Sequence, residues 1–416
     1  MEAQLHNREQ IFYGWKIVAA SVVILAFGFG MFFSTNGLFV VPVCESLGLS
    51  RAEFTFHRTV IMIASACALP FYGKAIQRFG VKKILFVGMA MLGMVTFGYS
   101  FATNMMHFYL LALVNGIFFA SVSFMTIGIL ISDWFTDKKG VANGFAFAGT
   151  GVGAAIMTPV ISRIIEQAGW RVAYRFMGAF GAIVLLPVIF FLIKDKPAQM
   201  GLTPYTSPGV KQETKSHVYN LSFREAIRTS RFWLLSIALI FIACYASSTT
   251  THSVPFLSDI GYSPAKVSAV IALVNVVLAG GKIVLGIIYD RFGTMVGNNF
   301  VSVCCITFPI AALFAHVPGI PWVYAVSVGM AGCALSVPVP ILINKYFGEK
   351  DYPVIFSIVS LFITFGSAVA VPSKGAIFDF TGSYDVAWII FLVFAVVVAI
   401  CLFAAEKTYK AEGARL

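Results

Sequence analysis

Apolar stretches of roughly 20 residues recur along the whole chain and constrain its fold more than any other feature. A helix needs about 20 mainly apolar residues to cross the hydrocarbon core of a bilayer, and lipid leaves only helices or closed barrels as spanning structures. We therefore predict an all-α membrane protein with twelve transmembrane helices. The predicted spans are residues 14–38, 54–75, 83–101, 105–132, 141–163, 172–193, 232–256, 265–288, 297–316, 320–343, 353–377 and 385–404.

The composition supports this class and excludes others. Of the 416 residues, 59% are hydrophobic and 11% are charged, whereas soluble domains carry about 25% charged residues. We read the net charge of +11 as a mark of loops on one side of a lipid bilayer, and we predict no nucleic-acid partner. The seven cysteines lack metal-ligand spacing, so we expect neither a metal nor a cofactor. Without an ATP-binding motif or a hydrolytic triad, we predict gradient-driven transport and no enzyme activity.

The longest polar gap, residues 194–231, divides the predicted spans into six and six. Pro, Gly, Ser and Thr dominate its first half, which is typical of a linker. We therefore predict two six-helix halves, residues 1–193 and 232–416, joined by a central loop over 194–231. We expect no further domain and a monomer.

An internal repeat supports this division. Gly73 begins a segment that ends in Arg78-Phe79-Gly80, and Gly286 begins one that ends in Asp290-Arg291-Phe292-Gly293, six spans later. A second echo joins residues 133–140 to residues 345–350. We predict that Gly73, Arg78, Gly80, Asp290, Arg291 and Gly293 belong to signature loops whose contacts form in one conformation and break in another. Two halves repeated in this way place a substrate site between them.

The distribution of lysine and arginine predicts the orientation. With the N-terminus inside, 21 of the 29 Lys and Arg residues fall in inside loops and tails, and 7 fall outside. Lys282 alone stays within the membrane. Because basic residues accumulate in cytoplasmic loops, we predict that both termini are cytoplasmic, in a multi-pass protein of the plasma (inner) membrane. The outside set is Arg51, Arg58, Arg163, Arg171, Arg175, Lys266 and Lys374.

Several short motifs, in order and spacing, resemble the major facilitator superfamily, and in particular its monocarboxylate-transporter and oxalate/formate-exchanger branch. The loop from Gly73 to Lys83 resembles the signature between the second and third helices of that superfamily. The finer match is carried by Tyr13-Gly14-Trp15, Asp133-Trp134-Phe135, Gly140-x-Ala142-x-Gly144, Gly169-Trp170-Arg171, Lys196-Pro197, Gly201-Leu202-Thr203-Pro204, Phe232-Trp233 and Thr381-Gly382-Ser383-Tyr384.

The resemblance implies a twelve-helix carrier that moves small carboxylates by proton symport or exchange. At three positions the chain departs from the branch. Lys282 stands where the branch has an arginine that pairs with the substrate carboxylate, and Phe124 stands where it often has a tyrosine. Leu278 replaces the acid or amide of proton-coupled members. These departures leave the implied fold unchanged and do not support the usual lactate-like substrate.

Lys282 is the main candidate for binding an anion. A lysine inside an apolar helix costs several kcal/mol unless it is compensated, and such residues are usually functional. Asn275 lies two turns earlier and shares the helix face of Lys282. The alternatives are that Lys282 extends to the surface and that Asn275 joins two helices by a hydrogen bond.

Three further side chains are candidates for substrate contacts. His252 follows a run of serines and threonines in the seventh predicted span and is either a packing residue or a titrating group. Arg58 and Lys374, near the outer ends of their spans, either extend to the surface or attract anions. Phe124 is a substrate contact by its place in the resemblance.

These observations predict a secondary active transporter of small organic anions that works by alternating access. The candidate substrates are monocarboxylates such as lactate, pyruvate and formate, or small dicarboxylates such as oxalate, with or without coupled protons. No Asp or Glu occurs in the middle third of any predicted span, which also favours an anionic substrate. The alternative is a carrier of the same fold for a larger aromatic or amphipathic compound, a drug or a metabolite.

Overall fold

The computed structural model describes residues 12–206 and 220–413. Arg8, Lys211, Lys215 and Arg415 of the charge count therefore lie outside the described residues, as does part of the predicted central loop. The described chain is almost entirely helical, and its only β-type pairing is an isolated bridge between Phe135 and Tyr205. This confirms the predicted all-α class.

Among the described residues, ten helical segments are long and apolar enough to cross a membrane, and α14 with α15 makes an eleventh if this pair, bent by 40°, counts as one span. One of the ten covers 49 residues, about 74 Å at 1.5 Å per residue, which exceeds twice the hydrocarbon thickness. Within it, Gly293 has φ 81° and ψ 172°, which is not helical. If the segment is divided at Gly293 and α14 with α15 counts as one span, the number of spans is twelve.

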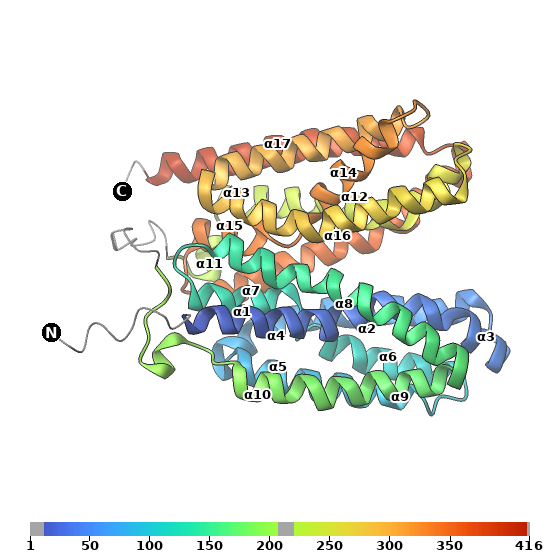
Figure 1. Ribbon diagram of the computed structural model, residues 1–416. Helices are drawn as coiled ribbons and strands as arrows, with labels where there is room; N and C mark the ends of the chain where they lie inside the picture. The colour runs from blue at the N-terminus through green and yellow to red at the C-terminus, as the bar shows by residue number, and fades with distance from the viewer. Residues whose placement is uncertain (1–11, 207–219, 414–416) are drawn as a thin grey trace.

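The first half is built from helices that pack along one another (Figure 1). The first span is irregular: a π-helical turn at Leu25–Gly30 and a 3₁₀ turn at Thr35–Phe39 separate its three helical pieces. The helices are α1 (Tyr13–Ile24), α2 (Met31–Ser34), α3 (Val40–Leu47), α4 (Arg51–Phe79), α5 (Val81–Tyr99), α6 (Met105–Phe119), α7 (Phe124–Trp134), α8 (Lys139–Ala168), α9 (Trp170–Phe180) and α10 (Leu186–Leu192).

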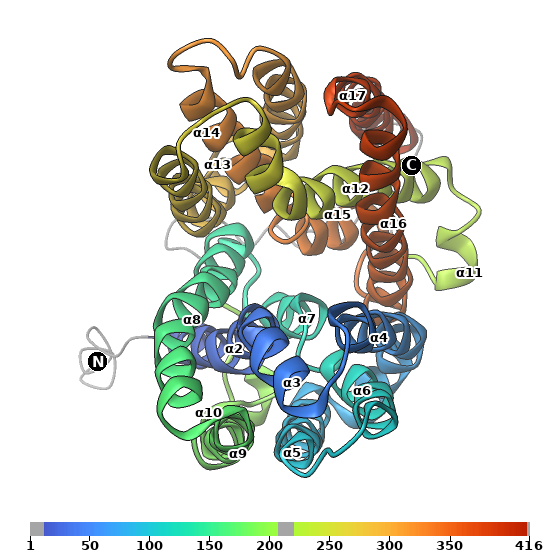
Figure 2. The same ribbon diagram turned by 90° about the vertical axis from the view of Figure 1, so that its right-hand side faces the viewer.

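The second half is reached through a short helix, α11 (Phe223–Ala226), near the end of the central loop. Its six longer helices are α12 (Ser230–Asp259), α13 (Pro264–Leu313), α14 (Ile320–Cys333), α15 (Pro338–Phe347), α16 (Tyr352–Thr381) and α17 (Asp385–Gly413). Figure 2 shows the helices up to α10 grouped on one side and those from α12 onward on the other. The division at 194–231 stays a proposal about independent halves.

The fourth and tenth predicted spans, residues 105–132 and 320–343, each contain a break in the helix. The fourth is interrupted between Phe119 and Phe124, and the tenth between Cys333 and Pro338. Pro338 and Pro340 account for the second break, because proline ends a helix and restricts the residue before it. At the first break, Ser123 precedes α7 and has an extended conformation (φ −114°, ψ 169°). Residues just before a helix commonly have this conformation.

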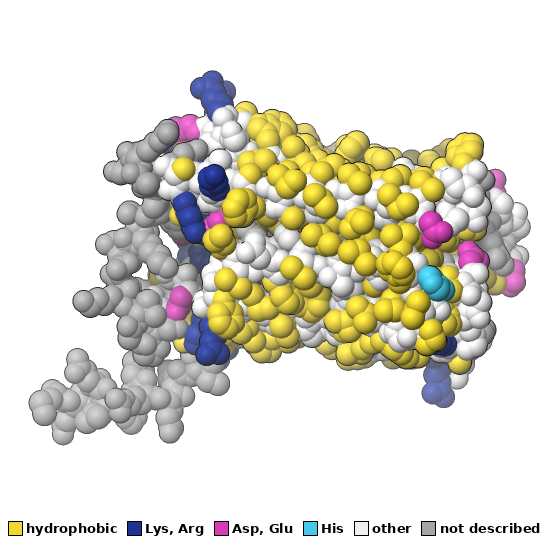
Figure 3. Space-filling view, turned by 90° about the horizontal axis from the view of Figure 1, so that it is seen from above, with side chains coloured by type: hydrophobic (Ala, Val, Ile, Leu, Met, Phe, Trp, Pro, Cys, Tyr) yellow, Lys and Arg dark blue, Asp and Glu magenta, His cyan; other side chains and the backbone are white. Residues whose placement is uncertain are grey.

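On the face drawn in Figure 3, hydrophobic side chains form a band between two ends at which charged side chains gather. We call the end where α1 begins and α17 finishes the terminus side, and the other end the opposite side (Figure 1). The band agrees with a bilayer environment, since lipid-facing surfaces must be apolar.

Aromatic residues of the resemblance motifs gather at the terminus side of the first half. The Tyr13 and Trp134 rings lie 5.5 Å apart, and the Trp15 and Phe135 rings lie 5.2 Å apart. Tyr205, at the start of the central loop, donates its N–H to the carbonyl of Trp134 at 2.9 Å. The motifs therefore hold the first span, the fourth span and the loop together.

Small residues allow close packing within the half and between halves. A Cβ at Gly149 would come within 2.5 Å of the Val22 carbonyl oxygen, so α8 fits against α1 only with glycine there. A Cβ at Gly144 would come equally close to the Lys282 carbonyl oxygen of α13. The glycine-rich part of α8 is thus a packing surface.

Candidate functional site

A cavity of about 240 Å³ lies between the two groups of helices. Most of its wall comes from α4, α5, α7 and their neighbours in the first half, and the remainder comes from α16 and the break between α14 and α15. Both halves therefore shape one cavity. Its size suits a small organic molecule better than a few waters.

The two helix breaks open onto this cavity. Ala120 and Ser123 line it from the break of the fourth span, and Leu335 and Ser336 line it from the break of the tenth. The two spans correspond in the internal repeat. Equivalent interruptions in the two halves therefore expose backbone to the same space, where irregular backbone is tolerated.

Arg58 is the only charged side chain among the described residues that line the cavity. Its guanidinium carbon lies 5.7 Å from the centre of the Phe33 ring, which also lines the cavity. None of the described lining residues carries a carboxylate. The cavity wall consequently carries a net positive charge, which attracts anions.

Four hydroxyl groups in the lining have no hydrogen-bond partner among the described residues: those of Thr96, Tyr99, Ser123 and Tyr174. Thr96, Tyr99 and Tyr174 are at most 3% exposed. Because unpaired buried hydroxyls cost about 1–3 kcal/mol each, they mark a place where a ligand or water completes the hydrogen bonding. Sequence reasoning missed these hydroxyl groups, because Ser, Thr and Tyr are ordinary residues of apolar spans.

A cluster of phenylalanines forms another part of the wall. The Phe29 ring stacks on those of Phe33 and Phe119 at centroid distances of 5.5 and 5.0 Å, and it lies 5.0 Å from Phe124. All four line the cavity. A ligand here meets aromatic faces on one side and hydroxyl groups on another.

Lys282 lies behind this aromatic wall and is absent from the described lining. Its side chain is 5% exposed, and its Nζ donates to the Phe147 carbonyl at 3.0 Å and to the Thr150 hydroxyl at 2.9 Å. The same Nζ lies 5.3 Å from the centre of the Phe124 ring. Burial excludes the alternative that Lys282 extends to the surface in this conformation. Lys282 instead joins α13 to α8 across the two halves.

Asn275 is not buried together with Lys282. It is exposed, although it lies two turns earlier on the same helix, and it is outside the described cavity lining. Periodicity places both residues on one helix face, but Lys282 is buried against α8 and Asn275 is exposed. A joint substrate site of Asn275 and Lys282 stays a prediction for another conformation.

Lys374 and His252 are brought together by a residue that the sequence did not single out for binding, Tyr384. The Lys374 Nζ lies 3.4 Å from the centre of the Trp388 ring and 5.4 Å from that of Tyr384. His252 Nδ1 is 3.3 Å from the Tyr384 hydroxyl. Lys374 is 1% exposed and its amine has no hydrogen-bond partner in the described residues, so it does not extend to the surface. The side chains of Thr250 and Thr251 nearby are outside the described residues.

Contacts between the halves gather at the terminus side and involve the signature loops. The Asp290 carboxylate accepts the backbone N–H groups of Gly140 and Val141, at 2.9 and 2.8 Å, at the start of α8. In the corresponding loop of the first half, Gln77 donates to Asp351 at 3.3 Å, at the start of α16. A carboxylate at a helix N-terminus is stabilised by the helix dipole.

The remaining signature residues have simpler surroundings. Gly73 lies so close to α16 that an added Cβ would be 2.6 Å from the Ser357 hydroxyl. Arg78 and Arg291 are exposed, each with its guanidinium over the phenylalanine that follows it, at 5.3 and 5.7 Å. The predicted bridging is therefore made by Asp290 and Gln77, and neither arginine takes part in it in the described contacts.

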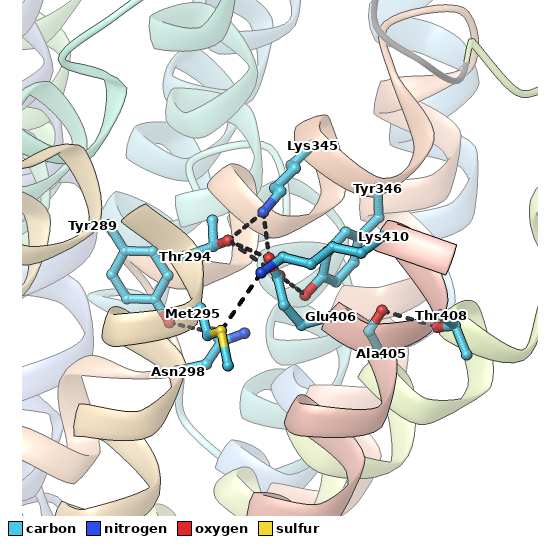
Figure 4. A network of polar contacts seen from close by, with 10 residues as sticks. All are labelled: Tyr289, Thr294, Met295, Asn298, Lys345, Tyr346, Ala405, Glu406, Thr408 and Lys410. Carbon is cyan, nitrogen blue, oxygen red and sulfur yellow. Dashed lines mark hydrogen bonds and ion pairs between the residues drawn. The ribbon is translucent and has the colours of Figure 1, made fainter. Parts of the chain in front are cut away.

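A buried carboxylate at the terminus side of the second half was missed by the sequence analysis. Glu406 is 4% exposed and pairs with Lys345 at 2.7 Å. It also accepts from Thr294 at 3.1 Å and from the Tyr346 hydroxyl at 2.9 Å (Figure 4). The network ties α13, α15 and α17 together. The sequence does carry a signal for this carboxylate, because Glu406 lies just beyond the end of the last predicted span, residues 385–404.

Comparisons with known proteins agree with this architecture. The sequence model of the Major Facilitator Superfamily matches residues 21–341. A solved structure with a similar fold is that of FucP, a transporter of that superfamily in the outward conformation. It has a TM-score of 0.68 and 11% identity, with 94% of this chain and 97% of FucP covered.

Curated relatives are distant. The uncharacterized transporter YhjX of Escherichia coli is 24% identical, with 80% of this chain and 82% of YhjX covered. The oxalate:formate antiporter of Oxalobacter formigenes is 26% identical over 67% of this chain, and monocarboxylate transporter 12 of Xenopus laevis is 23% identical over 70%. The matched regions span only 64% and 66% of those two proteins.

Proposed function

Because this chain belongs to the Major Facilitator Superfamily, which comprises membrane transporters and not enzymes, we propose that it is a secondary transporter of small organic anions. Membership makes it a multi-pass membrane transporter of a small molecule. The nature of that molecule, the coupling and the orientation are the parts that we propose.

The observation that carries the proposal is the charge of the cavity. Arg58 supplies a cation, and none of the described lining residues is acidic. Lys282 adds a second cation one aromatic ring behind the wall, 5.3 Å from the centre of Phe124. A neutral or cationic substrate would gain nothing from this arrangement, whereas an anion is attracted and its charge is compensated.

The names of two relatives support carboxylates within this class. They are an oxalate:formate antiporter and a monocarboxylate transporter. We accordingly propose monocarboxylates such as lactate, pyruvate or formate, or small dicarboxylates such as oxalate, moved by exchange or by proton symport. Lys282, Asn275, His252, Phe124, Arg58 and Lys374 are our proposed substrate contacts over the whole cycle.

The contacts between the halves support an alternating-access mechanism. In this conformation Asp290 holds the start of α8, and Lys282 holds the middle of the same helix. We propose that these bonds form while the terminus side is closed and break when it opens. On this account Lys282 exchanges the Phe147 carbonyl for the substrate carboxylate as the halves move.

The proposed orientation in the membrane rests on the basic residues of the loops. Basic residues favour cytoplasmic loops, so we propose that the terminus side faces the cytoplasm, in the inner membrane of a bacterial-type cell. The conformation described here is then the outward-facing one.

A second candidate function is the transport of a larger aromatic or amphipathic compound. The observation that favours it is the stacked cluster of Phe29, Phe33, Phe119 and Phe124 in the cavity wall. Aromatic faces bind planar ligands as readily as they fill space. Competition between neutral aromatic compounds and an organic anion separates the two functions.

Purified protein in liposomes, supplied with labelled oxalate, formate, lactate and pyruvate in uptake and counterflow assays, tests the proposal. We expect uptake of at least one anion, and Arg58→Gln should raise its KM by about tenfold, equivalent to one lost charge contact of 1.4 kcal/mol. Arg171→Gln is the matched control, because Arg171 binds the Ala102 carbonyl outside the lining. Absence of uptake and counterflow for every organic anion would refute the proposal.

A further inference from the structure

The start of α7 faces the cavity. Ser123, Phe124 and Met125 all line it, and α7 continues for 11 residues from Phe124. The first N–H groups of a helix have no partner within the helix. Together with the helix dipole they form a ready site for an anion.

Ser123 leaves these N–H groups available. It occupies the N-cap position, where a serine oxygen usually accepts from the second or third N–H of the helix. Here no side chain caps α7, and the Ser123 hydroxyl is itself without a partner in the described residues. The Ser123 hydroxyl therefore has no partner in the described chain, and the first N–H groups of α7 have none within the helix.

An independent observation concerns three further hydroxyl groups of the same cavity. The hydroxyls of Thr96, Tyr99 and Tyr174 line it, are at least nine-tenths buried, and have no partner in the described chain. Arg58 adds the positive charge. These groups match an oxyanion with several acceptor oxygens.

The equivalent break in the other half lacks this chemistry. The second helix there, α15, begins with Pro338, and Pro340 follows two residues later. Proline has no backbone N–H, so the start of α15 offers fewer donors than the start of α7. The asymmetry places the charged end of a ligand on the first half.

We propose that the start of α7 binds the carboxylate of the transported anion, with the Ser123 hydroxyl and the N–H groups of Phe124 and Met125 as donors. Arg58 supplies the charge from α4. This site rests on the proposed anion transport and deepens it. The Phe124 side chain cannot donate a hydrogen bond, and the backbone N–H of the same residue is the donor instead.

The test uses a permanent carboxylate. Ser123→Asp would place an acidic group at the start of α7, where it caps the helix and occupies the anion position. We expect a higher melting temperature without ligand and at least a tenfold weaker response to oxalate and pyruvate in thermal-shift titration. Ser123→Asn, which caps without charge, should weaken the response less.

Thr229→Asp is the matched control, because Thr229 precedes α12 at a helix start that also lacks a side-chain cap and lies outside the cavity lining. It should stabilise the protein and leave both responses unchanged. A second pair isolates the backbone: Phe124→Pro and Phe124→Ala remove the same ring, but only proline removes the N–H. The extended Ser123 is compatible with a following proline, and we expect weaker anion binding from Phe124→Pro.

The outcomes separate this site from the proposed function. If wild type transports an organic anion and both Ser123→Asp and Phe124→Pro respond as their controls do, the α7 site is refuted and anion transport stands. If wild type transports and binds no organic anion, both proposals are refuted together.

Discussion

Gly80 and Gly293 have nearly the same backbone conformation at equivalent points of the two halves, with φ 83° and ψ 160° in one and φ 81° and ψ 172° in the other. Each follows an Arg-Phe pair and each is followed at once by a new helix. This region of backbone space is essentially restricted to glycine. The repeated Arg-Phe-Gly sequence is therefore a repeated sharp reversal of the chain.

Gly293→Ala should lower the free energy of unfolding by about 1–3 kcal/mol, which is the usual cost of forcing a side chain into this conformation. No atom lies within 4 Å of the added Cβ, so backbone strain is the whole effect. Gly80→Ala should cost more, because its Cβ would lie 2.7 Å from the Asp195 carboxylate. Thermal unfolding of detergent-purified variants measures the order.

Gly280→Ala is the control for both glycine variants. Gly280 is helical and nothing lies within 4 Å of its added Cβ, so alanine should be neutral or stabilise by about 1 kcal/mol. Equal melting temperatures for Gly280→Ala and Gly293→Ala would contradict the strain explanation.

Asp290→Asn should loosen the closed terminus side. The Asp290 carboxylate accepts two N–H groups of α8, and asparagine keeps the size but loses the charge and one acceptor. Loss of about 1–2 kcal/mol from a charged helix contact changes the ratio of the two conformations by roughly 5–30-fold. Distance measurements between spin labels at the terminus ends of α8 and α13 would report the change.

Asp385→Asn removes a charge from the first turn of α17, away from the contact between α8 and α13, and should leave these distances unchanged. Identical distance distributions for Asp290→Asn and wild type would show that Asp290 does not hold the halves together.

The spans were predictable because each presents about 20 apolar residues, a signal that tertiary contacts do not alter. The break before Phe124 was not, because the run Ala120-Ser121-Val122-Ser123 is apolar enough to continue a helix. At this break Gly88 leaves space for the Ser121 side chain, a contact between distant segments that no local pattern reveals. The break of the tenth span could have been predicted from Pro338 and Pro340.

The sequence indicated charged residues for the candidate site, but it did not indicate how they lie relative to one another. Lys282 stood out because a cation in an apolar run is costly, yet its direction depends on the Phe147 carbonyl of another helix, which no local pattern reveals. The position of the Lys374 amine depends likewise on the Trp388 ring, which lies fourteen residues later in the chain, beyond a loop. Long-range contacts of this kind decide where each predicted side chain lies, and the sequence does not show them.

Lys282→Met should reduce uptake by at least tenfold and should not stabilise the protein. The Lys282 amine makes two hydrogen bonds to α8, each worth about 1.5–3 kcal/mol when the donor is charged. A methionine of similar length loses both bonds, and this loss offsets the free energy gained by no longer burying a charge. Lys282→Arg keeps the cation and should retain more uptake. Uptake by both variants at the wild-type level would exclude Lys282 from transport.

Lys374→Met should instead raise the melting temperature. The Lys374 amine is buried among Tyr384, Trp388 and Phe391 without a hydrogen-bond partner in the described residues, and cation–π contacts return only about 2 kcal/mol of the several that burial of a charge costs. Methionine fills the same space, packs well against aromatic rings and carries no charge. Lys374→Ala, which leaves a cavity, should be less stable than Lys374→Met by about 2–5 kcal/mol. A Lys374→Met protein that melts below wild type would show that the amine is compensated. A stabilised variant that no longer transports would show that Lys374 is kept at the expense of stability because the cycle requires its charge.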